Sequence, residues 1–237
     1  MLDAAPAPYD PRGPRSEQLR SVIVERGLFR PLDVLLVGAT GAGKSSTLNA
    51  IFGDTVAKVG EGVDPETKSI AAYRVHDYLR IHDSAGLGDG AEADVQHAKA
   101  ITQKLLNCCA PPQEGYRFID LALVVLDGSS RDLGTAFHLL ESVVLKAIAP
   151  ERVVVAINQS DQAMKGRHWN HGQNRPDTEL AKFLADKVDS VQRRIQESTG
   201  LHITPPVCYS ASRNWNIDRL MGHIIQHVPH AKRSVEQ

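Results

Sequence analysis

A glycine-rich octapeptide near the start of the sequence contains the residues with the clearest chemistry. Residues 38–45 read G-A-T-G-A-G-K-S and fit the pattern G-x-x-x-x-G-K-[S/T]. In such a loop, glycines let successive backbone N–H groups turn toward phosphate oxygens at the positive end of a following helix. Lys44 would reach the β- and γ-phosphates, and the Ser45 hydroxyl would bind Mg²⁺. The octapeptide therefore predicts a site for a nucleoside triphosphate. The remaining predicted phosphate contacts are Gly38, Ala39, Gly41, Ala42, Gly43 and Ser46.

Two further segments carry groups that could complete a triphosphate site. The sequence Asp83-Ser84-Ala85-Gly86 has a D-x-x-G spacing, in which Asp83 would hold Mg²⁺ through water and the Gly86 N–H would contact the γ-phosphate. D-x-x-G is weak evidence by itself, because an aspartate at a strand end is common. Thr67 ends a polar loop and could give its hydroxyl to Mg²⁺ and its N–H to the γ-phosphate, although an ordinary loop threonine remains an alternative. These segments predict catalytic roles for Lys44, Thr67 and Gly86, and Mg²⁺ ligands at Ser45, Thr67 and Asp83.

The elements that must position these groups alternate between strands and helices along the chain. Apolar runs predict strands at 33–37, 69–75, 79–82, 118–126, 152–157 and 206–209. Helical periodicity predicts helices near 44–52, 92–107, 132–147, 178–198 and 215–228. The run 118–126 is nearly all apolar, which is typical of a strand covered by helices on both faces. The order predicts an α/β fold, a three-layer P-loop NTPase sandwich around a mostly parallel six-stranded sheet. Ligands of such sheets bind at the carboxyl ends of the strands, where the octapeptide lies.

The 237 residues suit one domain with a substantial core. We expect a Pro-rich, disordered N-terminus and a short helix near 16–26 within residues 1–31. A nucleotide-binding domain would span 32–230, and residues 231–237 would form a C-terminal tail.

Composition restricts the possible partners and location. The chain has 27 basic and 28 acidic residues, so its charge gives no signal for broad binding to nucleic acid or to an anionic membrane. No apolar run approaches the ~20 residues of a membrane span, and the N-terminus lacks the apolar core of a secretory signal. The cysteines are Cys108, Cys109 and Cys208, of which two are adjacent, so we expect buried thiols and no disulfide framework. These features predict a cytoplasmic protein.

The last two strands end in polar sequences that suggest a base-binding site. Asn158-Gln159-Ser160-Asp161 follows strand 152–157, and Ser210-Ala211-Ser212 follows strand 206–209. Together with the three segments above, their order resembles the G1 to G5 motifs of small GTPases over roughly residues 33–228. The resemblance implies that Asp161 accepts hydrogen bonds from the guanine N1–H and 2-amino groups, and that Asn158 ties the base loop to the phosphate loop. It further implies that the Ala211 N–H supports guanine O6, that Ser210 braces the turn, and that Gln159 lies flat against the base. GTP or GDP is therefore expected in preference to ATP.

Finer details resemble one branch of these GTPases. The G-x-T-G-x-G-K-S-S loop, the D-S-A-G-L-G-D sequence at 83–89 and the N-Q-x-D motif resemble Era-like bacterial GTPases. The resemblance is closest to an uncharacterised bacterial group with N-Q-S-D or N-Q-A-D as its fourth motif, and it extends to residues 164–169. Leu87 stands where Ras-like proteins carry the glutamine that orients the attacking water. The resemblance thus implies a GTPase that is slow without homodimerisation or an activating protein.

Three functions remain open at this stage. The first is a GTP-dependent molecular switch with slow, Mg²⁺-dependent hydrolysis. The second is a non-hydrolysing module that uses guanine nucleotide to hold a dimer or scaffold, which Leu87 favours. The third, a kinase or ATPase on the same loop, leaves Asp161 and the Ser210-Ala211 pair without a purpose.

Three other signals have a plainer interpretation or remain open. His223, His227 and His230 have a spacing that could bind metal, but we expect them on a solvated face because apolar residues define the buried face of that helix. Cys108 and Cys109 are expected to pack at a helix end. The basic segment 162–176 contains no acidic residue and would close over the nucleotide, contact a partner, or form an ordinary surface excursion.

Overall fold

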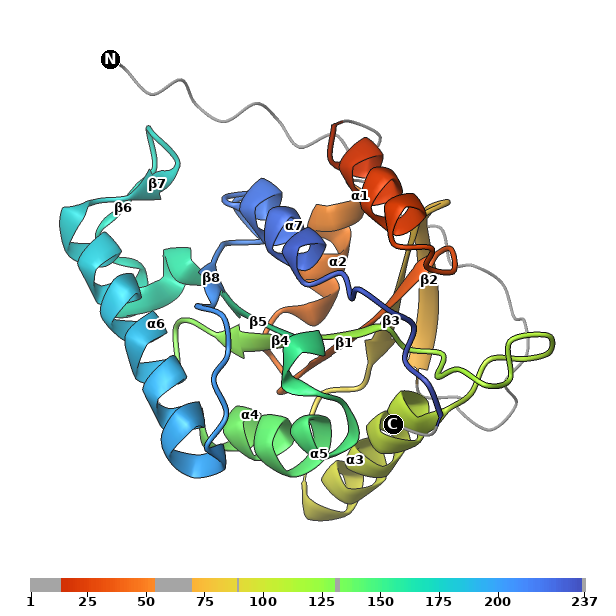
Figure 1. Cartoon of the computed structure of the whole chain (residues 1–237). Helices are drawn as coiled ribbons and strands as arrows, with labels where there is room; N and C mark the ends of the chain where they lie inside the picture. The colour runs from red at the N-terminus through yellow and green to blue at the C-terminus, as the bar shows by residue number, and fades with distance from the viewer. Residues whose placement is uncertain (1–13, 54–69, 89, 131–132, 236–237) are drawn as a thin grey trace.

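The computed structural model describes residues 14–53, 70–88, 90–130 and 133–235, and these form three layers (Figure 1). The central sheet has six strands in the order β2-β3-β1-β4-β5-β8, and only β2 runs antiparallel to its neighbour β3. Helices α1, α2 and α7 cover one face of the sheet, and α3, α4, α5 and α6 cover the other. The predicted α/β sandwich with a mostly parallel sheet is confirmed.

The strands and helices occupy the following residues. The sheet strands are β1 Leu32–Gly38, β2 Ile70–His76, β3 Leu79–Ser84, β4 Leu121–Asp127, β5 Val153–Asn158 and β8 Val207–Cys208, and a small hairpin joins β6 Trp169–Asn170 to β7 Arg175–Pro176. The α-helices are α1 Pro14–Glu25, α2 Lys44–Phe52, α3 Ala91–Leu106, α4 Gly134–Leu139, α5 Leu145–Ala147, α6 Thr178–Thr199 and α7 Ile217–Gln226. A π-helix, η1 Leu140–Val144, joins α4 to α5, and 3₁₀ turns occupy η2 Pro150–Arg152 and η3 Ser160–Gly166.

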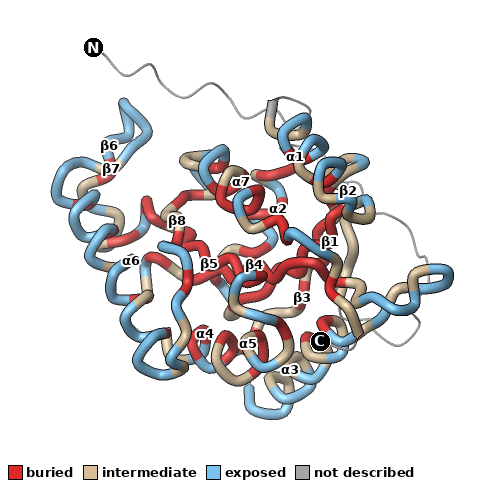
Figure 2. Tube along the Cα trace, in the orientation of Figure 1, coloured by how far each residue is buried: buried red, intermediate tan, exposed pale blue. Residues whose placement is uncertain are grey.

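Buried, alternating side chains explain why β1 lies at the centre of the sheet. All seven of its residues are buried, as the red trace in Figure 2 shows for the middle of the sheet. Val34 and Leu36 enter the core beneath α2 and α7, whereas Leu35 and Val37 enter the core beneath α3 and α4. Each such side chain contributes roughly 1.5–3 kcal/mol through burial. Because β1, β3, β4 and β5 run parallel, the loops that follow them meet at one edge.

Two predicted elements differ from the structure. The predicted helix 132–147 is interrupted by η1, so its hydrogen bonding changes over one turn. Strand β4 begins at Leu121, three residues later than predicted. The preceding Arg117 and Phe118 N–H groups donate to the carbonyls of Arg233 and Asn107, and so pair with loop segments in place of a strand.

Segments from the two ends of the chain are part of the packed structure. In α1, Leu19 and Ile23 are 0% and 2% exposed within the core shared with α7. Arg15 forms two hydrogen bonds with the Asp218 carboxylate of α7, at 2.8 and 2.9 Å. Near the other end, Arg233 donates to the carbonyls of Leu105 and Ala147. In the described ranges, every helix is too short or too polar to cross a bilayer.

The histidine and cysteine predictions need correction. His223 is 4% exposed, with its ring packed edge-on against His227 at 4.6 Å, so the predicted solvated face is wrong for this residue. Burial lowers the pKa of His223 to about 4. The apolar face of α7 is wide enough to include it, because α7 packs against both α1 and the sheet. The described residues contain no cluster of His, Cys, Asp or Glu suited to a metal ion. Cys108 is exposed, so the expectation of a buried thiol there is also wrong.

Candidate nucleotide-binding site

The glycine-rich loop connects β1 to α2 and curls around its own lysine. Lys44 is 9% exposed and its Nζ donates to the carbonyl oxygens of Gly38 at 3.1 Å and Ala39 at 3.2 Å. Helix α2 begins at Lys44, so the N–H groups of its first turn lie next to the loop. A cavity of about 650 Å³ lies beside the loop and the first residues of α2. The cavity is lined by Thr40, Gly41, Gly43, Lys44, Ser45, Ser46, Ala71, Asp83, Ser84, Ala85 and Gly86.

Most of the predicted phosphate residues meet at this cavity. Gly41, Gly43, Lys44, Ser45 and Ser46 line it directly. Gly38 and Ala39 act through their carbonyls on Lys44, and Ala42 is 1% exposed in the core. The cavity thus combines a lysine, a helix N-terminus and hydroxyl groups, which is a set suited to phosphates.

Gly43 is required by its neighbours as well as by the loop. Its φ angle is +84°, a conformation that L side chains rarely adopt. A Cβ atom there would lie 2.3 Å from the Asn158 Nδ2 atom. The phosphate loop therefore packs directly on the residue that ends β5.

Asp83, the next-to-last residue of β3, carries a buried oxygen without a partner among the described residues. Its Oδ1 atom is buried and accepts no hydrogen bond from the described residues, although Asp83 lines the cavity beside Ser45. Burial raises the pKa of Asp83, and the nearby Lys44 ammonium opposes that shift. An unsatisfied buried carboxylate oxygen costs free energy unless a cation or water completes it. Asp83 and Ser45 therefore have the donor chemistry that Mg²⁺ prefers.

The segment after Asp83 is fixed against the phosphate loop. The Thr40 N–H donates to the Leu87 carbonyl at 2.6 Å. A Cβ at Gly86 would lie 2.7 Å from the Thr40 backbone nitrogen, so no other residue fits there without a shift. The His97 ring donates from Nδ1 to the Gly86 carbonyl at 2.8 Å, and the Gly88 N–H donates to Asp94 at 2.6 Å. Helix α3 thus holds the D-x-x-G segment in place.

Leu87 faces the protein interior and not the cavity. Its side chain is 2% exposed and packs in the core beneath α3 and α4. Its backbone carbonyl, and not its side chain, contacts the phosphate loop. Thr67, which was predicted to be catalytic together with Lys44 and Gly86, lies outside the described residues.

Asn158 joins the base loop to the phosphate loop. It is 1% exposed, and its Nδ2 donates to the Ala42 carbonyl at 3.1 Å and the Gly43 carbonyl at 3.3 Å. Its Oδ1 accepts from the Ala211 N–H at 3.0 Å. A single amide therefore connects three of the predicted segments.

Asp161 lies in a ring of hydrogen-bond donors. It is 2% exposed, and its Oδ1 accepts from the Ser210 hydroxyl at 2.6 Å. Its Oδ2 accepts from Gln162 Nε2 at 2.7 Å and lies 3.5 Å from Arg213 Nε. Burial works against its ionisation, but the hydrogen bonds from Ser210 and Gln162 outweigh it and lower the pKa of Asp161. The carboxylate is therefore ionised and oriented at neutral pH.

Gln159 also contacts the phosphate loop, and its place flat against a base stays a prediction. Its backbone has φ of +59°, and its Nε2 donates to the Gly41 carbonyl at 2.6 Å. The side chain therefore lies across the phosphate loop and adds a second connection beside Asn158.

Sequence reasoning missed a buried connection between the fifth motif and α2. The Tyr209 hydroxyl lies 2.7 Å from the Thr47 Oγ1, which also lies 2.8 Å from the Gly43 carbonyl. Tyr209 is fully buried, and burial raises its pKa. Neither local sequence pattern indicates this connection. Sequence reasoning also missed Gln162, which is adjacent to Asp161, and His97 and Arg213, whose partners lie farther along the chain.

The basic segment 162–176 leads away from the phosphate cavity. It continues η3 into the β6–β7 hairpin, where Trp169 is 6% exposed and packs edge-on against Trp215 at 5.4 Å. None of its residues lines the phosphate cavity. In the described structure it therefore does not cover the phosphates.

The comparison that decides the family covers the phosphate loop, the D-x-x-G segment and the end of β5. Residues 33–159 match the model of the 50S ribosome-binding GTPase family, which is more than half of the chain. The chain belongs to this family. The protein is accordingly a GTP-binding GTPase domain, and the matched region includes the phosphate loop, Asp83 and Asn158.

Relatives of this GTPase are distant but extend over most of its length. It is 26% identical to the uncharacterized protein YfjP of Escherichia coli K12 over 218 residues, which is 90% of this chain and 68% of YfjP. Toc33 of Arabidopsis thaliana, solved with Mg²⁺ and GMPPNP, matches with a TM-score of 0.57 at 16% identity over 90% of this chain and 92% of Toc33.

Era provides a further comparison of the fold. Its structure with MgGDPNP and nucleotides 1506–1542 of 16S ribosomal RNA matches with a TM-score of 0.55 at 18% identity. The match covers 85% of this GTPase and 58% of the Era chain. These two structural similarities show a shared fold.

Proposed function

We propose that this GTPase domain is a Mg²⁺-dependent molecular switch that hydrolyses GTP slowly. The observation that carries the proposal is the oriented Asp161 carboxylate, linked through Ser210 and Asn158 to the phosphate loop. A fixed carboxylate suits the paired N–H donors of guanine, whereas the same edge of adenine offers no such pair. The Ala211 N–H lies in the same turn and would support guanine O6 once the base is bound.

The residues of the phosphate cavity would hold the triphosphate and its metal ion. Lys44 would leave its carbonyl partners for the β- and γ-phosphates, and Ser45 and Asp83 would hold Mg²⁺, directly or through water. The orphaned Asp83 oxygen supports this assignment. Bound Mg²⁺ would neutralise charge that develops on the phosphate oxygens. Thr67 and Gly86 would complete the γ-phosphate contacts and release them after hydrolysis.

Slow hydrolysis follows from the position of Leu87. A buried leucine cannot orient an attacking water, and even Ras with its glutamine turns over at roughly 3–5 × 10⁻⁴ s⁻¹. A homodimer or an activating protein would supply the missing group. We extend the proposal to the bacterial group with an N-Q-x-D fourth motif, because Gln159 makes a defined contact to the phosphate loop. We also propose a cytoplasmic location.

A second candidate is a guanine-nucleotide-dependent scaffold that does not hydrolyse GTP. The inward-facing Leu87 is the specific observation in its favour. In this case the nucleotide would hold two copies or a partner together, and the site would need no water-orienting group.

GTP turnover with Mg²⁺ over a range of protein concentrations tests the proposal, with ATP as a competitor for binding. A slow turnover that disappears in Lys44→Ala supports the switch. A rate per molecule that rises with concentration identifies a dimer as the source of the missing group. Tight GTP binding without turnover favours the scaffold, and preference for ATP overturns both.

A further inference from the structure

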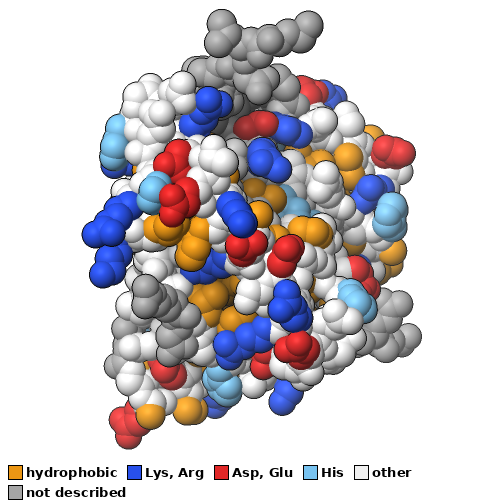
Figure 3. Space-filling view, turned by 90° about the vertical axis from the view of Figure 1, so that its left-hand side faces the viewer, with side chains coloured by type: hydrophobic (Ala, Val, Ile, Leu, Met, Phe, Trp, Pro, Cys, Tyr) orange, Lys and Arg blue, Asp and Glu red, His pale blue; other side chains and the backbone are white. Residues whose placement is uncertain are grey.

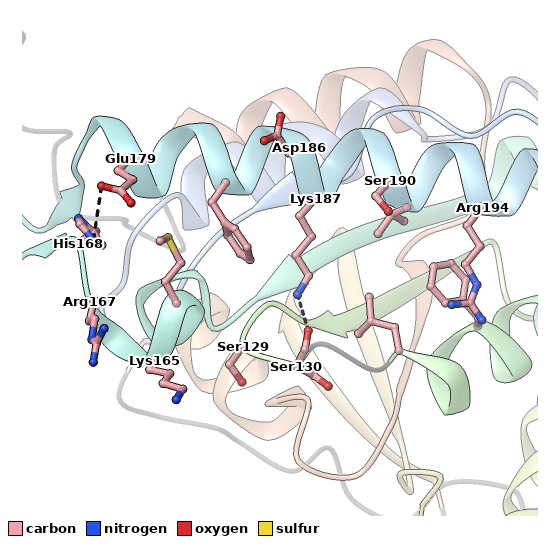
Figure 4. Close-up of a pocket in the computed structure, with 15 residues that line it drawn as sticks. Ser129, Ser130, Lys165, Arg167, His168, Glu179, Asp186, Lys187, Ser190 and Arg194 are labelled. Atoms are coloured by element: carbon pink, nitrogen blue, oxygen red, sulfur yellow. Dashed lines mark hydrogen bonds and ion pairs between the residues drawn. The ribbon is translucent and has the colours of Figure 1, made fainter.

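A second cavity, larger than the phosphate cavity, lies along α6 and is not used by the proposed nucleotide chemistry. It measures about 770 Å³ and is bounded by η3, by α6 and by the segment after β4 (Figure 4). We refer to it as the α6 groove. Its described lining comprises Ser129, Ser130, Leu133, Phe137, Met164, Lys165, Arg167, His168, Glu179, Phe183, Asp186, Lys187, Ser190, Val191 and Arg194.

Apolar side chains form the middle of the α6 groove. Phe137 and Val191 are buried and belong to the core beneath the groove, and Leu133 packs against that core. Phe183 stands 39% exposed, which makes it one of the few large apolar side chains open to solvent in the described structure. Figure 3 shows that hydrophobic side chains reach the surface on this face between charged ones. An aromatic side chain exposed in a concave site is a favourable anchor for a protein partner.

Cations occupy both ends of the groove. Lys165 and Arg167 are exposed at one end, and neither forms an ion pair with a described residue. At the other end Arg194 lies over the Phe137 ring at 4.1 Å, so its guanidinium is fixed at the surface. Figure 4 places these side chains at opposite ends of the view.

The acidic lining residues do not cancel this charge pattern. The Glu179 carboxylate is exposed and lies 3.7 Å from His168 Nε2. Asp186 projects from the far side of α6 relative to Ser129 and Ser130 in Figure 4. Lys187 donates to the Gly128 and Ser130 carbonyls at 2.7 Å and braces the wall. The described lining therefore carries four Lys or Arg side chains against two carboxylates, and its net charge is positive.

The end of the groove formed by η3 adopts an unusual backbone. Met164, Lys165 and His168 have φ angles of +54°, +64° and +68°, in the left-handed region that non-glycine residues rarely adopt. Such conformations cost free energy and persist where surrounding structure holds them, often at binding sites. Lys165 and Arg167 both belong to the lining at this end of the groove.

We propose that the α6 groove binds an acidic amphipathic helix of a partner protein. The groove walls are helices and loops without an open strand edge, so a bound peptide must satisfy its own backbone hydrogen bonds, as a helix does. From Glu179 to Arg194 the groove follows α6 for roughly 22 Å at 1.5 Å per residue. A helix of about four turns fits this length, with apolar residues on Phe183 and carboxylates at both ends toward Lys165, Arg167 and Arg194.

Selection of peptides from a random 16-residue display library on the full chain tests this proposal. Enriched peptides are then titrated by fluorescence anisotropy against the wild type and four variants. Phe183→Asp and Arg194→Glu change the groove, and Ala185→Asp and Arg193→Glu place the same charges at exposed neighbouring positions outside it. Thermal unfolding followed by circular dichroism establishes that all four variants fold.

The proposal predicts enriched peptides with net negative charge and apolar residues at helical spacing. Both groove variants should weaken their binding by about tenfold or more, since truncating an anchor commonly has this effect. Both control variants should change it less than twofold. Failure to enrich peptides, enrichment of basic peptides, or equal losses in the control variants would overturn the proposal. A wild-type dimer that Phe183→Asp converts to a monomer would also overturn it, because a second copy would then fill the groove.

Discussion

Replacing Asn158 by alanine should uncouple the two loops of the nucleotide site. The change removes the donors to the Ala42 and Gly43 carbonyls and the acceptor for the Ala211 N–H. The Gly43 carbonyl keeps the Thr47 N–H and hydroxyl as partners. The Ala42 carbonyl and the Ala211 N–H each lose a hydrogen bond of about 3 Å to Asn158. Each unsatisfied buried group costs about 1–3 kcal/mol. Because Ala211 is half-buried and can reach water, we expect a total of about 2–4 kcal/mol.

Urea unfolding of the nucleotide-free protein measures this loss, and calorimetric titration with GDP measures its effect on binding. Gln159→Ala serves as the matched control, because it removes a single, solvent-exposed hydrogen bond to the same loop, the 2.6 Å bond to the Gly41 carbonyl. The control should lower the free energy of unfolding by about 1 kcal/mol or less. If Asn158→Ala loses no more than Gln159→Ala, the argument that Asn158 joins the loops is refuted.

Three further changes test separate parts of the structure. Gly43→Ala places a side chain on a backbone with φ of +84° and against Asn158. Calorimetry should therefore show GDP affinity reduced more than tenfold, and unchanged affinity would contradict this packing. Leu87→Gln buries an amide in the apolar core, so urea unfolding should show a free energy of unfolding lower by about 1–3 kcal/mol. Phosphate release per molecule should not rise in this variant, and a faster rate would mean that the side chain can reach the cavity. The pKa of His223 is about 4 in the folded state and 6.5 in an unfolded chain, so protons favour unfolding between these values. Lowering the pH from 8 to 5 should therefore reduce the free energy of unfolding by about 2 kcal/mol through His223. Asp120, whose pKa is raised to about 6 by burial, changes stability in the opposite direction, so the His223 effect is read as the difference between the wild type and His223→Gln; equal pH dependence in both proteins would contradict it.

Local sequence determined the parts of the site that a short stretch of chain can form alone. The glycine-rich octapeptide, the strand before it and the helix after it were predicted from residues 33–52, and the structure has them within a residue or two. Strands 153–158 and 121–127 were recognisable because their apolar runs are buried on both faces. The parallel order followed from the alternation with helices.

Contacts between distant segments were not predictable in the same way. The Tyr209–Thr47 hydrogen bond joins residues 162 positions apart, and nothing in either local pattern indicates it. The hydrogen bond from Gln159 Nε2 to the Gly41 carbonyl joins residues 118 positions apart and was likewise not predicted. His223 was placed on the solvated face because helical periodicity identifies the centre of a buried face better than its edges.

The packing of α1 on α7 has a consequence for the order in which the chain is synthesised. Arg15 and Asp218 are separated by 203 positions, so the α7 surface that packs on Leu19 and Ile23 is made long after α1. At about 5–20 residues per second, α1 waits roughly 10–40 s on the ribosome before α7 exists. During that interval its two apolar side chains lack their final cover, and a chaperone that shields emerging apolar segments would have its clearest target there.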